Sequence, residues 1–144
     1  MTDESRHSAL DALAVVVGAW VTELEHPSFD GPVRGRAELE WLEGERFLLQ
    51  RSRAEHPKVP DSIAVIGVME DGELAMHYFD SRGVQRVYGV AVDGDEWRMW
   101  RDAPGFSQRF SGTIGAAEIA GQWQLSQDGE TWADDLEITY RRAA

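Results

Sequence analysis

The chain has 144 residues, enough to bury a core, and a formal net charge of −12. It contains no cysteine, which excludes disulfides and thiolate metal sites, and Lys58 is its only lysine. Nucleic acids and anionic membrane surfaces both require clustered positive charge, so we expect neither as a partner. We expect residues 1–7 to be a disordered N-terminus and residues 8–144 to form one domain.

The N-terminal apolar run, Ala12 to Ala19, has eight residues and is too short to span a bilayer. Mostly acidic residues precede it, which is the wrong charge for a secretory signal, so we expect a cytoplasmic protein of bacterial type. Ser8 is typical of a helix N-cap. A short helix over Ala9–Val17 is predicted, with Gly18 as its C-cap.

After Gly18 the hydrophobic period changes from helical to two. The clearest case is 33–43, in which apolar and small residues from Val33 to Trp41 share one face and charged residues occupy the other. The expected strands are 20–25, 33–43, 46–54, 63–69, 73–80, 84–93, 96–102, 107–114, 118–127 and 131–142. Short turns such as Asp71-Gly72, Asp93-Gly94 and Asp128-Gly129 connect many of them and indicate hairpins.

Ten short strands joined to their next neighbours form an antiparallel meander, and closing it into a barrel removes the exposed edges. We therefore predict an all-β fold: a closed antiparallel up-and-down β-barrel of about ten strands with a short N-terminal helix. A barrel of this size has room for one small ligand and no channel.

The combination of a short helix, Gly18-Ala19-Trp20 and an up-and-down barrel resembles the calycin superfamily of lipocalins, fatty-acid-binding proteins and nitrobindins. The resemblance implies that Trp20 plugs one barrel end and that Arg141 or Arg142 of the last strand packs over it. The stretches "WLEGERFLLQRS", "YFDSRGVQRVY" and "LEITYRR" look like an uncharacterised bacterial lipocalin-like domain of unknown function.

Two better-known relatives can be compared by residue. Nitrobindins extend Gly-x-Trp with two further glycines and bind haem through a C-terminal histidine. Here Thr22 and Leu24 occupy those glycine positions, and no histidine follows His77, so we expect no haem or other cofactor. Fatty-acid-binding proteins hold a carboxylate with Arg-x-Tyr. Here the order is reversed, Tyr140-x-Arg142, but both side chains still share a face of the strand.

Several groups have both structural and functional interpretations. Asp80 to Gly83 fits a hairpin turn, while Arg82 or Arg86 at a barrel mouth would steer an anion inward. The strand 73–80 is apolar on both faces, so either Met76 or His77 could face inward. A strand that is apolar on both faces indicates either that a partner covers the outer face of the barrel or that the cavity is lined by both polar and apolar groups.

The primary hypothesis is binding of a small, mainly apolar or amphipathic molecule with a polar or anionic end. The expected ligand-binding residues are Trp41, Arg51, His77, Tyr88, Trp100, Tyr140 and Arg142. Alternatives are an isomerase, cyclase or hydrolase that uses His77 or an inward aspartate as acid or base, a nitrobindin-like haem protein, and a homodimeric interaction module. No metal site is expected, because no two histidines have a metal-binding spacing.

Overall fold

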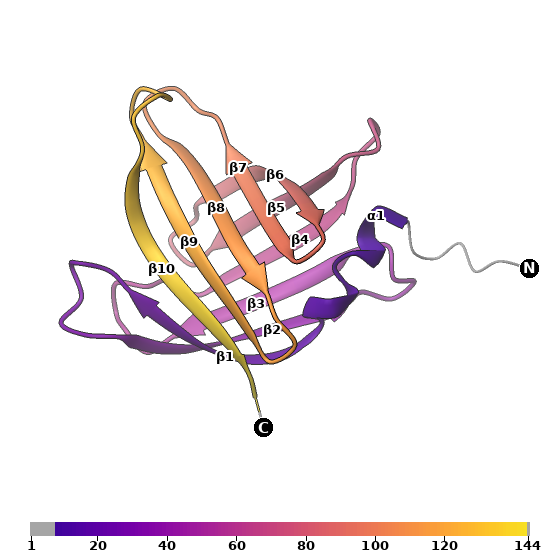
Figure 1. The fold of residues 1–144 in the computed structure, drawn as a ribbon, viewed down its shortest axis with the longest axis horizontal. Helices are drawn as coiled ribbons and strands as arrows, with labels where there is room; N and C mark the ends of the chain where they lie inside the picture. The colour runs from indigo at the N-terminus through magenta and orange to yellow at the C-terminus, as the bar shows by residue number, and fades with distance from the viewer. Residues whose placement is uncertain (1–7, 144) are drawn as a thin grey trace, which may run out of the picture.

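The computed structural model describes residues 8–143, so the expectation for residues 1–7 lies outside the described residues. Two short helical turns precede ten strands (Figure 1). The elements are α1 (Ser8–Asp11), the 3-10 turn η1 (Ala14–Val16), β1 (Gly18–Glu25), β2 (Val33–Trp41), β3 (Leu48–Ala54), β4 (Ser62–Val68), β5 (Leu74–Asp80), β6 (Gln85–Asp93), β7 (Glu96–Arg101), β8 (Ser107–Ile114), β9 (Glu118–Ser126) and β10 (Ala133–Arg142). Among these residues, no helix is long and apolar enough to cross a membrane.

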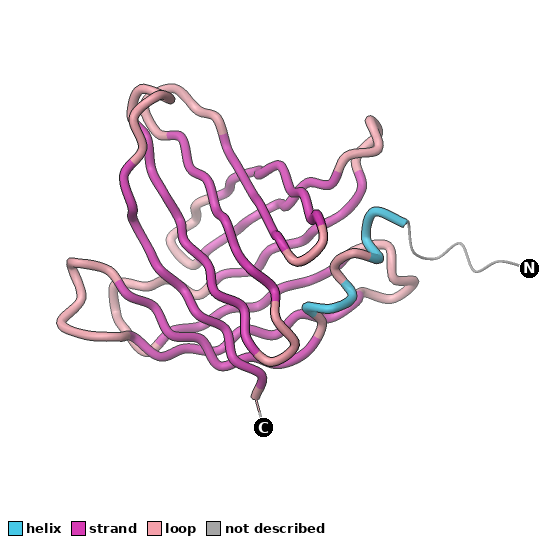
Figure 2. Tube along the Cα trace, viewed as in Figure 1, coloured by secondary structure: helices cyan, strands magenta, loops and turns pink. Residues whose placement is uncertain are grey.

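The ten strands form a closed antiparallel up-and-down barrel, which confirms the predicted fold class. Each strand pairs with its neighbours in sequence, and β1 closes the barrel against β10, with Trp20 opposite Arg142. Figure 2 shows the strands between two groups of loops. We define the barrel mouth as the end formed by the connections 26–32, 55–61, 81–84, 102–106 and 127–132.

The predicted helix over Ala9–Val17 is wrong in extent. One α-helical turn ends at Asp11, and after it the backbone N–H of Leu13 and of Val16 bond three residues back. Val17 is already extended, with φ −64° and ψ 134°. The β-branched valines disfavour a longer helix. Gly18, expected as a helix cap, instead opens β1 with φ 138°, a conformation that favours glycine.

The hydrophobic core fills the end of the barrel opposite the mouth. Leu10, Leu13 and Val16 from the N-terminal segment are 1% exposed or less and pack with the inward side chains of the strands. Trp97 and Phe110 meet edge to face there, with ring centroids 5.6 Å apart. Because this end is solid, any hollow in the barrel must open toward the mouth.

Candidate functional site

The closed end is secured by Trp20 and Arg142. The Arg142 guanidinium lies 4.0 Å from the centre of the Trp20 ring, and its Nη1 and Nη2 donate to the carbonyls of Val17 and Val15 at 2.6 Å each. The Trp20 Nε1 donates to Val16 O at 3.0 Å. Arg142, and not Arg141, therefore performs the expected stacking, and this role engages its donors away from the cavity.

A cavity of about 260 Å³ opens from the barrel lumen toward the mouth. Its lining combines apolar side chains with phenol, amide and hydroxyl groups, as small-molecule sites commonly do. The strand residues that line it include Thr22, Leu24, Gln50, Ser52, Ser62, Ala64, Met76, Tyr78, Arg86, Tyr88, Met99, Gln108, Trp123, Leu136, Ile138 and Tyr140.

Two buried tyrosines place hydroxyl groups on this cavity. Tyr88 Oη donates to Gln108 Oε1 at 2.9 Å, and Tyr140 lies near Gln50 on the cavity lining. Burial raises the pKa of both phenols, although the nearby Arg86 partly lowers that of Tyr88. Both hydroxyls therefore stay protonated at neutral pH. The Tyr140 hydroxyl can donate to a polar ligand group, whereas the Tyr88 hydroxyl already donates to Gln108 and can accept from one.

At the mouth, Tyr78, Asp80 and Arg82 form a closed ionic turn. Arg82 Nη2 donates to Asp80 Oδ2 at 2.7 Å, and Tyr78 Oη donates to the same oxygen at 2.8 Å. The Arg82 hydrogen bond holds the pKa of Asp80 well below its usual range, while burial and then Asp80 raise the pKa of Tyr78. Arg82 N donates to Asp80 Oδ1 and Gly83 has φ 85°, so the expected hairpin turn is confirmed.

A second cluster ties the 26–32 loop to β10 across the mouth. The backbone N–H of Ser28 donates to His26 Nδ1 at 3.0 Å, so Nδ1 is an acceptor and Nε2 carries the proton that it donates to Asp135 Oδ1 at 3.0 Å. The hydroxyl of Ser28 also lies 2.7 Å from Nδ1. His56 accepts from Lys58 N in the same kind of local turn, so this arrangement shapes the rim.

The structure brings only part of the expected site together. Tyr88 and Tyr140 line the cavity. Arg142 lies over Trp20, and Trp41 packs against the core at the closed end.

The other three expected residues, Arg51, His77 and Trp100, lie on the outer wall, which corrects their predicted position in the lumen. In β5 the inward side chains are Leu74 and Met76, which are buried, and Tyr78, which is half-buried. His77 takes the opposite face. Whether any of these residues binds a ligand stays a prediction. Because His77 does not line the cavity, it is not placed for the acid–base role expected there.

Sequence reasoning missed Tyr78, Gln50, Gln108 and Trp123 as cavity residues. Gln50 was detectable, because it shares a strand face with the apolar Leu48. Asp135 reaches the cavity after a register shift between Asp134 and Leu136, which strand alternation does not reveal.

The cavity does not suit a haem held by histidine. Within residues 8–143, no histidine is among the residues that line it. His26 at the rim has both ring nitrogens engaged, and His77 faces outward. The donors that do line the cavity are phenols, amides, hydroxyls and guanidinium groups such as that of Arg86, which suit hydrogen bonding to an organic molecule.

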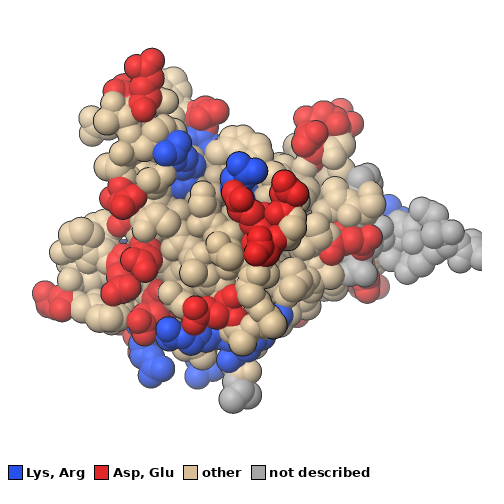
Figure 3. Space-filling model, in the orientation of Figure 1, with Lys and Arg blue, Asp and Glu red and all other residues tan. Residues whose placement is uncertain are grey.

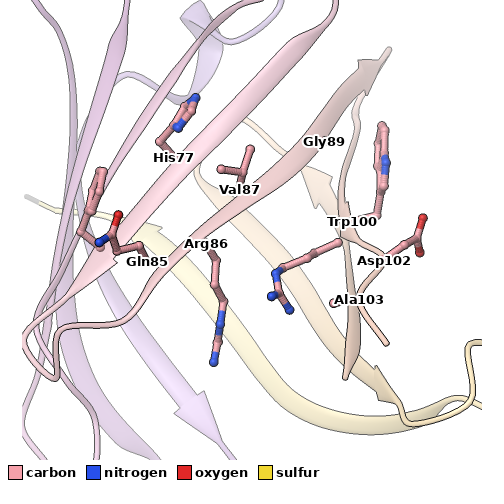
Figure 4. Close-up of a pocket in the computed structure, with 10 residues that line it drawn as sticks. His77, Gln85, Arg86, Val87, Gly89, Trp100, Asp102 and Ala103 are labelled. Atoms are coloured by element: carbon pink, nitrogen blue, oxygen red, sulfur yellow. The ribbon is translucent and has the colours of Figure 1, made fainter. Parts of the chain in front are cut away.

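A larger hollow of about 640 Å³ lies on the outer wall between β5 and β7 (Figure 4). His77, Val87 and Trp100 contribute to it, and Trp100 covers Gly89, where a Cβ would lie 2.4 Å from the indole. Figure 4 shows His77 and Val87 on one side of their strands and Arg86 on the other. Arg86 lines both this hollow and the lumen cavity.

Comparison with known proteins supports the fold. No protein-family profile matches the chain, and no curated protein matches its sequence significantly. The crystal structure of Rv2717c from M. tuberculosis is similar over 96% of this chain and 99% of that one, with 19% identity and a TM-score of 0.66. At this identity the likeness shows the barrel fold alone.

Two further structures match at lower scores. A de novo designed fluorescence-activating β-barrel has 15% identity and a TM-score of 0.46, covering 92% of this chain and 98% of the design. A protein of unknown function from the DUF3598 family of Nostoc punctiforme has 8% identity and a TM-score of 0.29, covering 95% of this chain and 100% of that one. These two scores are too low to support a structural argument.

Proposed function

We propose that the protein binds a small, mainly apolar molecule with a polar end in the lumen cavity. The observation that carries this proposal is a hollow of about 260 Å³ in which buried Tyr88 and Tyr140 present hydroxyls among apolar side chains. Leaving such groups buried without partners is costly; Tyr88 is hydrogen-bonded to Gln108, and Tyr140 lies near Gln50. A ligand would complete a polar network that is already organised.

The same proposal includes a calycin-like identity for the barrel. It is supported by the geometry of the closed end, where Trp20 of Gly18-Ala19-Trp20 lies beneath Arg142. A Cβ at Gly18 would lie 2.5 Å from the Arg142 Nη1, so glycine makes room for the guanidinium. Fold alone does not define a ligand, and the cavity supplies the chemical argument.

Native mass spectrometry of the protein purified from its own cells tests this function. We expect a stoichiometric adduct that is released on denaturation and that carries a polar or anionic group on an apolar body. A mass equal to that of the chain alone would count against a resident ligand. A haem adduct would contradict the conclusion that the residues lining the cavity do not suit a haem.

A second candidate is self-association through the outer wall, with a second copy of this chain as the occupant. Ile63, Phe79, Val87 and Trp100 are between 40% and 52% exposed on neighbouring strands. The outward residues of β4 and β5, and those of β6 as far as Ala91, carry no carboxylate, so two copies could meet here despite the net charge of −12. Sedimentation equilibrium would show a dimer that Val87→Glu dissociates. A wild-type monomer would exclude it.

A further inference from the structure

The barrel wall splits at the mouth between β6 and β7. The β6–β7 ladder runs from Asp93 opposite Glu96 to Gly89 opposite Trp100 and stops there. The first four residues of β6, from Gln85 to Tyr88, continue to pair only with β5. Two neighbouring strands therefore separate at the end of the barrel where the cavity opens.

Arg86 lies at this split. It belongs to the separated part of β6, and it lines both the lumen cavity and the outer hollow, so the two spaces adjoin at its side chain. Arg86 and Tyr88 lie two residues apart on the same face of β6, and both line the lumen cavity. A group bound by Arg86 would thus reach the polar network of the lumen directly.

Arg101 approaches the same place from β7. Its Nη1 donates to the carbonyl of Phe106 at 3.2 Å, and the guanidinium carbon of Arg86 lies 5.2 Å from the centre of the Phe106 ring. Phe106 therefore holds both guanidinium groups beside the split. A single residue of the 102–106 loop links the two separated strands.

Neither Arg86 nor Arg101 forms an ion pair with a carboxylate within residues 8–143. The nearby mouth carboxylates are already engaged, Asp80 by Arg82 and Asp135 by His26. Asp102 also lines the outer hollow, but Figure 4 shows it directed away from Arg86.

The chain as a whole carries a large excess of carboxylates. Figure 3 shows carboxylates over much of one face of the molecule, in keeping with a net charge of −12. Two uncompensated guanidinium groups at a cavity mouth are unusual on such a surface, because a free carboxylate on the chain itself would be expected to pair with them. The geometry leaves them available to an external anion.

We propose that Arg86 and Arg101 bind the carboxylate of a small aromatic acid whose ring occupies the lumen cavity. This inference rests on the proposed function and names its ligand class. A guanidinium fork matches a carboxylate with two parallel hydrogen bonds. Tyr78, Tyr88 and Trp123 give the cavity aromatic walls, which suit a flat ring. The volume of about 260 Å³ lies below the roughly 300–1,000 Å³ of drug-sized sites, so the ligand is small.

The test compares two probes by calorimetric titration: 4-phenylbutyrate and its neutral analogue, 4-phenylbutanol. Both carry the same ring and chain, so only the acid uses the arginines. We expect the wild-type protein to bind the acid more tightly. Arg86→Gln and Arg101→Gln should each weaken binding of the acid about tenfold or more, while binding of the alcohol stays unchanged.

Arg98→Gln is the matched control. Arg98 lies on β7 but is 53% exposed and pairs with Glu96, away from the mouth. It should leave the affinity for both probes unchanged. Retained binding of 4-phenylbutanol by Arg86→Gln would also show that this variant is folded.

The possible failures are distinguishable. Equal affinity for acid and alcohol in the wild type, or equal loss of both in the arginine variants, would overturn the carboxylate site and leave lumen binding intact. No binding of either probe would count against the lumen site itself and against this inference with it. If Arg98→Gln weakened binding of the acid as much as Arg86→Gln does, the weakening would come from the change in net surface charge and not from a site at Arg86, which would overturn the proposal.

Discussion

Replacing Arg142 by alanine tests how the barrel is closed. The side chain makes two charge-assisted hydrogen bonds of 2.6 Å to the carbonyls of Val15 and Val17 and stacks on Trp20. Hydrogen bonds to charged groups contribute about 1.5–3 kcal/mol each, and a cation–π contact about 0.5–2 kcal/mol. Because Arg142 is in contact with solvent, the low end of these ranges applies, and we expect Arg142→Ala to lower the free energy of unfolding by about 2–4 kcal/mol.

Urea unfolding, followed by tryptophan fluorescence and near-UV circular dichroism, measures this loss. Arg141→Ala is the matched control, because Arg141 is adjacent and pairs only with Glu118 among the described residues, with both side chains more than half exposed. Such surface pairs contribute about 0–1 kcal/mol. Arg142→Lys keeps the charge but not the two-pronged donation, so it should fall between the wild type and Arg142→Ala. Equal destabilisation by Arg141→Ala and Arg142→Ala would refute the reasoning.

Two further substitutions test the mouth and the core. Asp80→Asn removes the carboxylate bound by Arg82. Because the pKa of Asp80 is depressed in the folded state, the loss of stability caused by this substitution should be complete at pH 7 and should shrink below about pH 4. Urea unfolding of wild type and variant across that pH range measures the difference. An effect that does not change with pH would contradict this origin. Gly121→Ala places a Cβ 2.4 Å from Phe110 Cε1 and should cost about 1–3 kcal/mol in thermal or urea unfolding. Gly31→Ala meets no atom within 4 Å and should change stability by less than about 0.5 kcal/mol; similar losses in both would exclude the contact with Phe110 as the cause.

Most of the fold could be predicted from the hydrophobic pattern of the strands. Period-two alternation and Asp-Gly turns are local signals, and all ten expected strands are present with ends that differ by a few residues. The strand 33–43 was the easiest, because its charged face is exposed from end to end. The N-terminal helix was overextended, since a valine run is apolar in either conformation and only its packing beneath Trp20 decides between them.

The site was less predictable, because it depends on which face of each strand points inward. In β5 both faces are apolar, so alternation could not choose between Met76 and His77. Trp100 looked like a lumen aromatic, yet it covers Gly89 on the outer wall. Tyr140 does lie on the cavity, and its strand carries mainly polar residues on the opposite face, which is the signal that alternation can use.

The split between β6 and β7 could not be predicted from the sequence at all. The residues from Gln85 to Tyr88 alternate as a normal strand does, and nothing in them marks the point at which one ladder ends. That Arg86 borders both hollows follows only from the three-dimensional arrangement.

The central claim, that the lumen binds a small molecule, is tested most directly by methyl NMR of the protein labelled with ¹³C-methyl methionine. Met76 and Met99 line the cavity, whereas Met69 is 45% exposed outside it and serves as an internal reference. On titration with 4-phenylbutyrate, we predict saturable shifts of the Met76 and Met99 resonances and none of Met69. Unchanged Met76 and Met99 resonances, or a shift confined to Met69, would contradict binding in the lumen.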